Sequence, residues 1–383
     1  MKDGKLRVAL VGASFGAEFL PIYLHHPDVY SVLLIDANEK HLKKIADKFL
    51  FPMDQCTTDY QSALNDPTID AIHLVVPPAL HAPMSVQALQ AGKHCACTIP
   101  MGMTMQELED VIRARKASGK KYMFMETTVY AREYLYIKDL YESGEMGRVQ
   151  YYRCAHYQDM EGWPEYWEGY PPLMHPTHAV APCLALSGKR PVSVFGKGSG
   201  KIREELTKKY GCPFAFEAAL ITLEDNETTV EMERFLYHVA RSYSECFCAY
   251  GENKSFEWEQ LHGEGHVVFT RDMHQDQSKR GATILTEHLK TPDYAHLLPD
   301  EISRFTKRGV YDESNPHLSF KQGGGHGGSH PHLVHEFVRS IIEDRTPFPS
   351  DIDGAYWTGV GLLAHESAME GGVVKTLPVY EEI

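Results

Sequence analysis

The first ~125 residues alternate short apolar runs with helix-like stretches, and this alternation constrains the fold more than any other feature. The apolar runs are four to six residues long, as expected of strands buried on both faces of a sheet. Strands that alternate with helices predict a parallel, doubly wound sheet. The predicted strands are Arg7–Val11, Val32–Ile35, Ala71–Val76, His94–Cys97 and Tyr122–Met125, and the predicted helices include Lys40–Phe49, Ala82–Ala91 and Met105–Ser118.

The first predicted strand runs into the turn Gly12-Ala13-Ser14-Phe15-Gly16-Ala17, and a helix is expected after it. In the dinucleotide fingerprint, glycines permit a tight turn and a close approach to pyrophosphate. Gly12 supplies the turn, Ser14 replaces the second glycine, and Gly16 lies near the third. Backbone N–H groups at a helix start can still hold phosphate. The turn therefore predicts a Rossmann domain, although a small-residue turn without a ligand has the same pattern.

Two features at the carboxyl edge of the predicted sheet support a nicotinamide cofactor. Asp36 ends the second predicted strand, where an acid hydrogen-bonds the adenosine ribose hydroxyls. Its charge repels a 2′-phosphate, so we expect NAD in preference to NADP. Pro77 and Pro78 follow the Ala71–Val76 strand and lack backbone donors, which suits a wall against the cofactor. A capping or turn role for Asp36 is the alternative.

After Gly147 the pattern changes to consecutive strands with short turns, which predicts an antiparallel sheet. We expect a Rossmann domain over residues 1–126 and an α+β domain with an open, mainly antiparallel sheet over residues 127–383. The polar region from about Arg271 to Gln322 shows no clear periodicity. The predicted strands are Arg148–Tyr157, Val192–Gly196, Ala215–Leu223, Thr228–Phe235, Glu245–Tyr250 and Val267–Thr270, and the predicted helices are His178–Leu186, Leu333–Glu343 and Tyr356–Met369.

Composition narrows the partners and the compartment. A formal net charge of −14 argues against binding to nucleic acid or to an anionic membrane. The apolar runs are too short for a membrane span or a signal peptide. The eight cysteines lack paired zinc-type spacing, so we expect buried free thiols and a cytoplasmic location.

Three further segments resemble the glucose-fructose oxidoreductase / inositol dehydrogenase / MocA (Gfo/Idh/MocA) family. These segments are Pro77-Pro78-Ala79-Leu80-His81, Ala91-Gly92-Lys93-His94 and Thr98-Ile99-Pro100 before a helix. The resemblance covers nearly the whole chain and implies an NAD(P) enzyme that acts on a ring hydroxyl of a sugar or cyclitol. The family usually has Glu-Lys-Pro where this chain has Thr98-Ile99-Pro100. Ile99 has no titratable group, so the proton acceptor lies elsewhere or the chemistry differs.

A subgroup of that family, the NAD-dependent α-N-acetylgalactosaminidases, also has an apolar residue at the position of Ile99. Its Glu-x-x-x-Tyr-x-Arg segment resembles Glu126–Arg132, and its Pro-Thr-His segment resembles Pro176–Pro182. A late Gly-His-Gly-Gly run resembles Gly325–Gly328. His175 and the middle region depart from the subgroup, which bears on N-acetyl specificity. Related NAD-dependent glycosidases act on other glycosides, including sulfoquinovosides.

The resemblance implies a redox-neutral hydrolysis of a glycoside. Carbon 3 of the sugar is oxidised, the acidified proton on carbon 2 is removed, the group on carbon 1 leaves, water adds and carbon 3 is reduced again. No carboxylate pair is needed, unlike in ordinary glycosidases. A net sugar or cyclitol dehydrogenase with an unusual base is the second interpretation, and a non-enzymatic NAD-binding regulator is the third. An open antiparallel sheet also suggests a homo-oligomer.

The candidate site residues fall into three groups, and each has a structural alternative such as packing, capping or ion pairing. Histidine suits proton transfer because its pKa lies near neutrality, and aromatic rings can stack on sugar C–H faces. The candidates are His178, Tyr130 and His175 for catalysis; Gly12, Ser14, Phe15, Gly16, Asp36, Pro77, His81, Thr98 and Glu126 for NAD; and Arg132, Trp163, Trp167 and His326 for substrate.

The late histidines raise a metal hypothesis that we do not favour. His332 and His335 share a face if they are helical, and Glu336 is the one acidic residue within the run that holds His326 and His330. The adjoining glycines suit a close backbone approach to the sugar instead. We therefore expect no metal at these histidines, with His326 as a hydrogen-bonding residue.

Overall fold

The computed structural model describes residues 1–272, 280–307, 309 and 326–383. They form two compact units, each assembled from separate stretches of the chain. The first unit comprises Met1–Ala131, Asp293–Ala355 and Val379–Ile383, and the second comprises Arg132–Pro292 and Tyr356–Pro378. In the structure, residues 293–355 belong to the same compact unit as the N-terminal segment. The predicted domain limits, 1–126 and 127–383, remain a proposal about which parts of the chain fold independently.

The sheet of the first unit is parallel, with the strand order β3-β2-β1-β4-β5-β6. Its central strands are buried on both faces, which is why they read as apolar runs. The predicted doubly wound sheet is confirmed. The short strand β3 was not predicted, because two half-buried residues carry no periodic signal. The strands are β1 (Leu6–Val11), β2 (Val29–Ile35), β3 (Cys56–Thr57), β4 (Ala71–Leu74), β5 (His94–Cys97) and β6 (Tyr122–Phe124).

Two helices of this unit have recognisable caps. Asn38 accepts a hydrogen bond from the His41 backbone N–H (3.1 Å) where α2 begins, and Gly119 ends α5 with a left-handed φ of 64°. The chain after the glycine turn forms a 3-10 turn, η1 (Phe15–Glu18), before a short helix α1, rather than one continuous helix. The helices are α1 (Leu20–His25), α2 (Glu39–Phe49), α3 (Tyr60–Asn65), α4 (Pro78–Gln90), α5 (Met105–Ser118), α9 (Asp300–Ser303) and α10 (His330–Ile342).

Helix α10 belongs to the hydrophobic core of the first unit, although it lies some 300 residues from β1 along the chain. Its buried residues Leu333, Val334 and Phe337 share one core cluster with Leu10 and Phe19. The late histidines therefore lie in the same unit as the glycine turn.

The second unit is built on a sheet with the strand order β14-β13-β12-β11-β7-β10-β9-β8-β15. Neighbouring strands are antiparallel except β7 and β10, which are parallel because α7, β8 and β9 intervene along the chain. The predicted mainly antiparallel sheet is confirmed; β12, β14 and β15 were not predicted. The strands are β7 (Val149–Tyr157), β8 (Pro191–Ser199), β9 (Phe216–Leu223), β10 (Thr229–Phe235), β11 (Ser244–Gly251), β12 (Lys254–Glu257), β13 (Val267–Arg271), β14 (Ile284–His288) and β15 (Lys375–Thr376).

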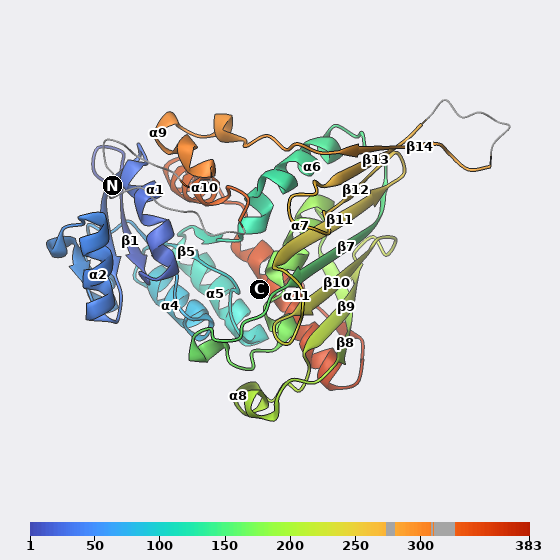
Figure 1. Cartoon of the computed structure of the whole chain (residues 1–383). Coiled ribbons are helices and arrows are strands. Elements are labelled where there is room, and N and C mark those ends of the chain that lie inside the picture. Colours follow the sequence, from blue (N-terminus) through green and yellow to red (C-terminus); the bar gives the residue numbers. More distant parts are fainter. Residues whose placement is uncertain (273–279, 308, 310–325) are drawn as a thin grey trace. The chain divides into compact units, whose positions relative to one another are not determined.

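Two helices, α7 (Thr177–Ser187) and α11 (Asp351–Met369), cover one face of this sheet (Figure 1). A Cβ on Gly196 of β8 would lie 2.0 Å from the Ala364 carbonyl oxygen, so α11 approaches β8 closely. The other face leaves Leu220 47% and Phe195 38% exposed. This unit also contains α6 (Arg132–Glu142) and α8 (Thr207–Tyr210).

Six of the eight cysteines are buried, and Cys56 and Cys246 are half-buried. All eight cysteines are free, and burial raises the pKa of the Cys95 and Cys97 thiols. Among the helices that the structure describes, none has the length and apolarity that a membrane span requires.

Candidate active site

Gly12 shapes the turn that follows β1. Its φ is +93°, and a Cβ there would lie 2.0 Å from the Val75 carbonyl oxygen. Only glycine fits this combination of left-handed backbone and close approach. Gly16 is different, since its Cβ would meet Val75 at an ordinary 3.5 Å. The first glycine of the fingerprint is thus required sterically, whereas the later position would accept alanine.

Asp36 closes the turn from the neighbouring strand. One carboxylate oxygen accepts a hydrogen bond from the Ala13 N–H (2.8 Å), and the other accepts one from the Asn38 N–H (2.8 Å). These two bonds orient the carboxylate at the carboxyl end of β2. A carboxylate has about four acceptor positions, so oxygen lone pairs are left for ribose hydroxyls. The cradle that Gly12 and Asp36 form fits the adenosine half of NAD.

Ser14 and Phe15 begin the 3-10 turn that replaces a regular helix start. The Ser14 hydroxyl lies 3.2 Å from His41 Nε2. The Phe15 ring is 38% exposed and packs edge-on against Phe19, His326 and His330 at centroid separations of 5.6–5.9 Å. Both side chains therefore lie at the surface of the cradle.

His81 links the turns that follow β4 and β5. Its ring nitrogens lie 2.7 Å from the Val76 carbonyl oxygen and 2.6 Å from that of Pro100, and the Thr98 hydroxyl is 3.4 Å away. Burial lowers the pKa of His81, although the two carbonyl contacts oppose this effect. His81 thus connects the two turns that carry Pro77 and Thr98. Ile99, next to Thr98, is half-buried.

Glu126 is fully buried and caps the 3-10 turn η3 (Thr127–Tyr130). Its carboxylate accepts hydrogen bonds from the backbone N–H (3.0 Å) and the hydroxyl (2.9 Å) of Thr128. Next to it, the Thr127 hydroxyl lies 3.1 Å from His326 Nδ1. Within the first unit, Glu126 and His326 therefore lie at the same turn. Of the Gly-His-Gly-Gly run, Gly325 lies outside the described residues.

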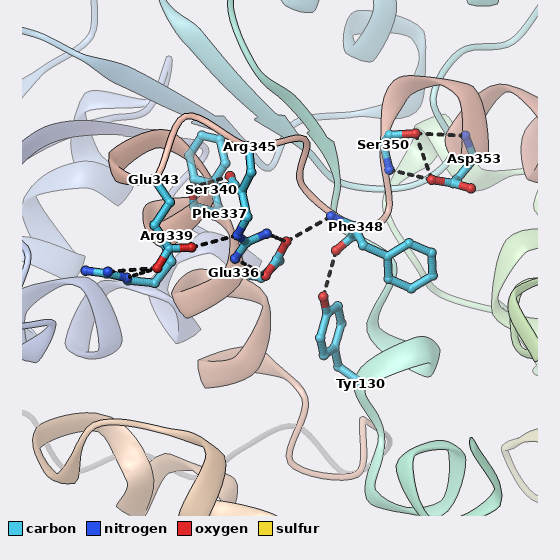
Figure 2. Close-up of polar contacts among 10 residues, drawn as sticks. All are labelled: Tyr130, Glu336, Phe337, Arg339, Ser340, Glu343, Arg345, Phe348, Ser350 and Asp353. Carbon is cyan, nitrogen blue, oxygen red and sulfur yellow. Dashed lines mark hydrogen bonds and ion pairs between the residues drawn. The ribbon is translucent and has the colours of Figure 1, made fainter. Parts of the chain in front are cut away.

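The hydroxyl of Tyr130 donates a hydrogen bond to the Phe348 carbonyl oxygen (2.7 Å), as Figure 2 shows. Its ring stacks on His332 at 6.3 Å with an interplanar angle of 11°. Glu336 accepts a bond from the Phe348 N–H (3.0 Å) and is paired with Arg345, which fixes the turn that Tyr130 contacts. The structure thus gives Tyr130 a packing role, and its proposed catalytic role has to be tested separately.

The remaining histidines of α10 take different partners. His330 Nδ1 lies 3.5 Å from a Glu18 carboxylate oxygen, and His335 Nδ1 lies 3.0 Å from His26 Nε2. His26, His330 and His335 therefore take part in packing and polar contacts around α1 and α10.

Three histidines converge in the second unit. His175 follows the 3-10 turn η5 (Pro172–Met174), His178 is the second residue of α7, and His156 lies on β7. Their ring centroids are 5.4 Å apart for His156 with His178, 5.4 Å for His175 with His178 and 6.0 Å for His156 with His175. The structure thus brings His175 and His178 together and adds His156, which the sequence alone did not indicate.

Arg234 on β10 donates hydrogen bonds to two members of this histidine cluster. It is fully buried and donates hydrogen bonds to the carbonyl oxygens of His175 (3.1 Å) and His156 (3.0 Å), and to His175 Nδ1 (3.3 Å). Burial lowers the pKa of Arg234 to about 9, although Tyr243, Glu245 and Tyr237 oppose this. Because an arginine donates, His175 Nδ1 acts as an acceptor.

An acidic partner completes the cluster. Glu245 on β11 lies 3.7 Å from His178 Nε2, and its carboxylate also accepts a hydrogen bond from the Tyr243 hydroxyl. Only 8% of Glu245 is exposed. A carboxylate at this distance stabilises the positive charge that forms when an imidazole takes up a proton. The arrangement can therefore accept and return a proton.

The candidate substrate residues of this unit lie at different depths. Trp167 is buried and packs edge-on against His175 at 5.2 Å, whereas Trp163 is 45% exposed and contacts Trp167 at 6.4 Å. Arg132 is half-buried at the first residue of α6. The aromatic segment thus reaches the histidine cluster through Trp167.

Comparisons with known proteins agree with this architecture. Residues 6–126 match the model of the Gfo/Idh/MocA oxidoreductase family, NAD-binding Rossmann fold. A glycosyl hydrolase family 109 protein of Stenotrophomonas maltophilia is 22% identical over 95% of this chain and 86% of its own length. An α-N-acetylgalactosaminidase of Shewanella oneidensis is 26% identical, but the match covers only 32% of this chain and 29% of that protein.

Solved structures of sugar enzymes share the fold. A levoglucosan dehydrogenase in complex with NADH and levoglucosan aligns over 98% of this chain and all of its own, with a TM-score of 0.76 and 20% identity. A myo-inositol 2-dehydrogenase of Lactobacillus plantarum aligns over the same shares, with a TM-score of 0.69 and 17% identity. The family match over residues 6–126 agrees with the resemblance that the motifs at residues 77–100 indicated. The Rossmann domain of this chain binds NAD, as the glycine turn and Asp36 predicted.

Proposed function

We propose that this chain is an NAD-dependent glycoside hydrolase. The sugar is oxidised transiently at carbon 3, loses its group from carbon 1, adds water there and is reduced again at carbon 3. The match to a family 109 glycosyl hydrolase over 95% of the chain supports this proposal. So does Ile99, which cannot take the part of the lysine that ordinary dehydrogenases of the family use.

The observation that carries the proposal is the pairing of His178 with Glu245 at 3.7 Å. We assign His178 as the group that takes the proton from carbon 2. Glu245 stabilises the resulting imidazolium, and the Tyr243 hydroxyl keeps the carboxylate in place. After the group on carbon 1 has left, His178 returns a proton to carbon 2. A positioned base of this kind contributes about 10²–10⁴-fold to a rate.

A bound NAD⁺ would supply reversible hydride acceptance at carbon 3 of the sugar. Gly12 and Asp36 hold its adenosine half, and Asp36 favours NAD over NADP. We also assign Ser14, Phe15, Gly16, Pro77, His81, Thr98 and Glu126 to the cofactor site, and His175, Tyr130, Arg132, Trp163, Trp167 and His326 to the substrate or its proton transfers.

A net sugar or cyclitol dehydrogenase is the second candidate. The likeness to levoglucosan dehydrogenase and myo-inositol 2-dehydrogenase favours it. The two candidates differ in cofactor stoichiometry, because a dehydrogenase makes NADH for each sugar and the hydrolase regenerates NAD⁺.

Replacement of the proposed base tests the function. We expect His178→Gln to slow the release of an aryl aglycone by about a hundredfold or more, with NAD affinity unchanged. His262, which is 78% exposed, offers a matched control, and His262→Gln should keep full turnover. A His178→Gln enzyme that releases aglycone at the rate of the unmodified protein would remove His178 from the mechanism.

We further propose a cytoplasmic enzyme that forms homo-oligomers. The exposed apolar side chains of Leu220 and Phe195 lie on the uncovered face of the second sheet, where a second copy would bury them. Light scattering coupled to gel filtration should show a mass above 43.3 kDa. A monomer at micromolar concentration would contradict this part of the proposal.

A further inference from the structure

The second unit contains another cluster of side chains with metal-binding chemistry. Cys212 follows α8, Glu217 lies on β9, and His365 lies on α11. One sulfur, one oxygen and one nitrogen from these residues all lie within 4.8 Å of one another. Three separate elements thus bring three different ligand types to one point.

We propose that Cys212, Glu217 and His365 bind a divalent transition-metal ion, with Zn²⁺ as the best match. Zinc accepts thiolate, imidazole and carboxylate ligands at roughly 2.0–2.3 Å, which places ligand atoms roughly 3.3–3.7 Å apart. The cluster is close to that spacing, so a shift of about 1 Å in the side chains would close the site. Three protein ligands leave a fourth tetrahedral position for water.

The cluster is buried, yet one of its three side chains can be reached from solvent. Glu217 is fully buried and Cys212 is 1% exposed, while the His365 side chain is 14% exposed and leaves access for an ion. A buried carboxylate needs a compensating charge or hydrogen bonds. One Glu217 oxygen accepts a hydrogen bond from the Leu173 N–H (2.8 Å), and the other lies 2.7 Å from His365 Nδ1.

The charges balance when a divalent ion binds. The ion takes the place of the hydrogen that His365 Nδ1 shares with Glu217. The His365 ring then carries its hydrogen on Nε2 and stays neutral. The Cys212 thiol has to lose its proton to become a ligand, and this proton leaves as the ion binds. The two charges of the ion then cancel those of one thiolate and one carboxylate, and one proton is released to solvent.

The site would connect to the histidine cluster through the chain. Glu217 accepts a hydrogen bond from the N–H of Leu173, which lies two residues before His175. In α11, a Cβ on Gly361 would lie 2.3 Å from the Leu173 carbonyl oxygen, so the same helix that carries His365 packs against this segment. A bound ion would therefore fasten β9 and α11 to the segment that carries His175.

Cobalt substitution tests the proposal on the untagged, full-length protein. After chelator dialysis, Co²⁺ should bind in a one-to-one ratio and give a near-ultraviolet thiolate-to-cobalt absorption band. Cys212→Ser should abolish the band, and Cys246→Ser, a control at a half-buried cysteine on β11, should keep it. Elemental analysis should find zinc in the protein purified without chelator.

A second variant separates metal binding from the hydrogen bond between Glu217 and His365. His365→Asn should weaken Co²⁺ binding by about tenfold or more, the scale of losses at metal sites, whereas His262→Asn should not. Absence of the band in the unmodified protein, or its survival in Cys212→Ser, would leave a hydrogen-bonded pair and overturn the proposal. None of these readouts depends on turnover, so failure here leaves the proposed glycosidase function intact.

Discussion

Replacement of Gly12 by alanine tests whether the turn after β1 is built for a cofactor. The new Cβ would lie 2.0 Å from the Val75 carbonyl oxygen, and ordinary contact begins at 3.4 Å, so the two strands would have to separate by about 1.4 Å at this point. A left-handed alanine costs about 1–2 kcal/mol, and overpacking costs about 1–3 kcal/mol. We expect Gly12→Ala to lower the free energy of unfolding by about 2–5 kcal/mol.

Two other glycines provide matched controls. Gly119 has a φ of +64° with nothing within 4 Å of its Cβ position, so Gly119→Ala should cost only the backbone term, about 1–2 kcal/mol. Gly16→Ala should cost less than about 1 kcal/mol, because helix-forming alanine meets ordinary contacts there.

The assays are denaturant unfolding and NAD titration followed by fluorescence. Displacement of the turn should weaken NAD binding by at least about tenfold in Gly12→Ala, which is equivalent to about 1.4 kcal/mol. Gly119→Ala should bind NAD normally. If Gly12→Ala were no less stable than Gly119→Ala and bound NAD normally, the steric argument for the cradle would be refuted.

Three further changes probe other parts of the molecule. Asp36→Ala should narrow the preference for NAD over NADP, and equal affinities in the unmodified protein would contradict the assignment. Arg234→Met should lower stability by about 2–4 kcal/mol in urea unfolding, since buried carbonyl oxygens lose their donor; an unchanged midpoint would contradict that role. Burial lowers the pKa of His26 from 6.5 to about 4, so its contribution to stability is complete above pH 6.5 and is lost as the pH falls through 4. The free energy of unfolding should therefore change with pH between 4 and 6.5, by about 1.4 kcal/mol per pH unit at most. His26→Gln should make this dependence on pH weaker, and an identical pH profile of thermal unfolding would contradict the burial argument.

The sequence predicted the parts of the fold that periodicity encodes. Helix α5 was predicted at its observed bounds, and Arg7–Val11 differs from β1 by one residue. The break between η1 and α1 was not predicted, although Pro21 at the start of α1 carries a signal for it. β14 was missed because its residues are exposed and lie in a polar region without alternation.

The candidate site was only partly predictable, for a physical reason. His175 and His178 lie in one local motif, so a resemblance could identify them. His156, Arg234 and Glu245 come from three different strands, and only the register of β7 with β10 and β11 brings them together. A buried arginine within an alternating strand was the one local signal, because charged residues are seldom fully buried without partners.

The measurement that tests the central claim most directly is turnover of aryl glycosides in deuterated water. Release of aglycone and NADH absorbance are followed together, and the released sugar is analysed by NMR. The proposed hydrolase should label carbon 2 of the sugar with deuterium and should not accumulate NADH. Stoichiometric NADH without label at carbon 2 would contradict the hydrolase and identify a net dehydrogenase.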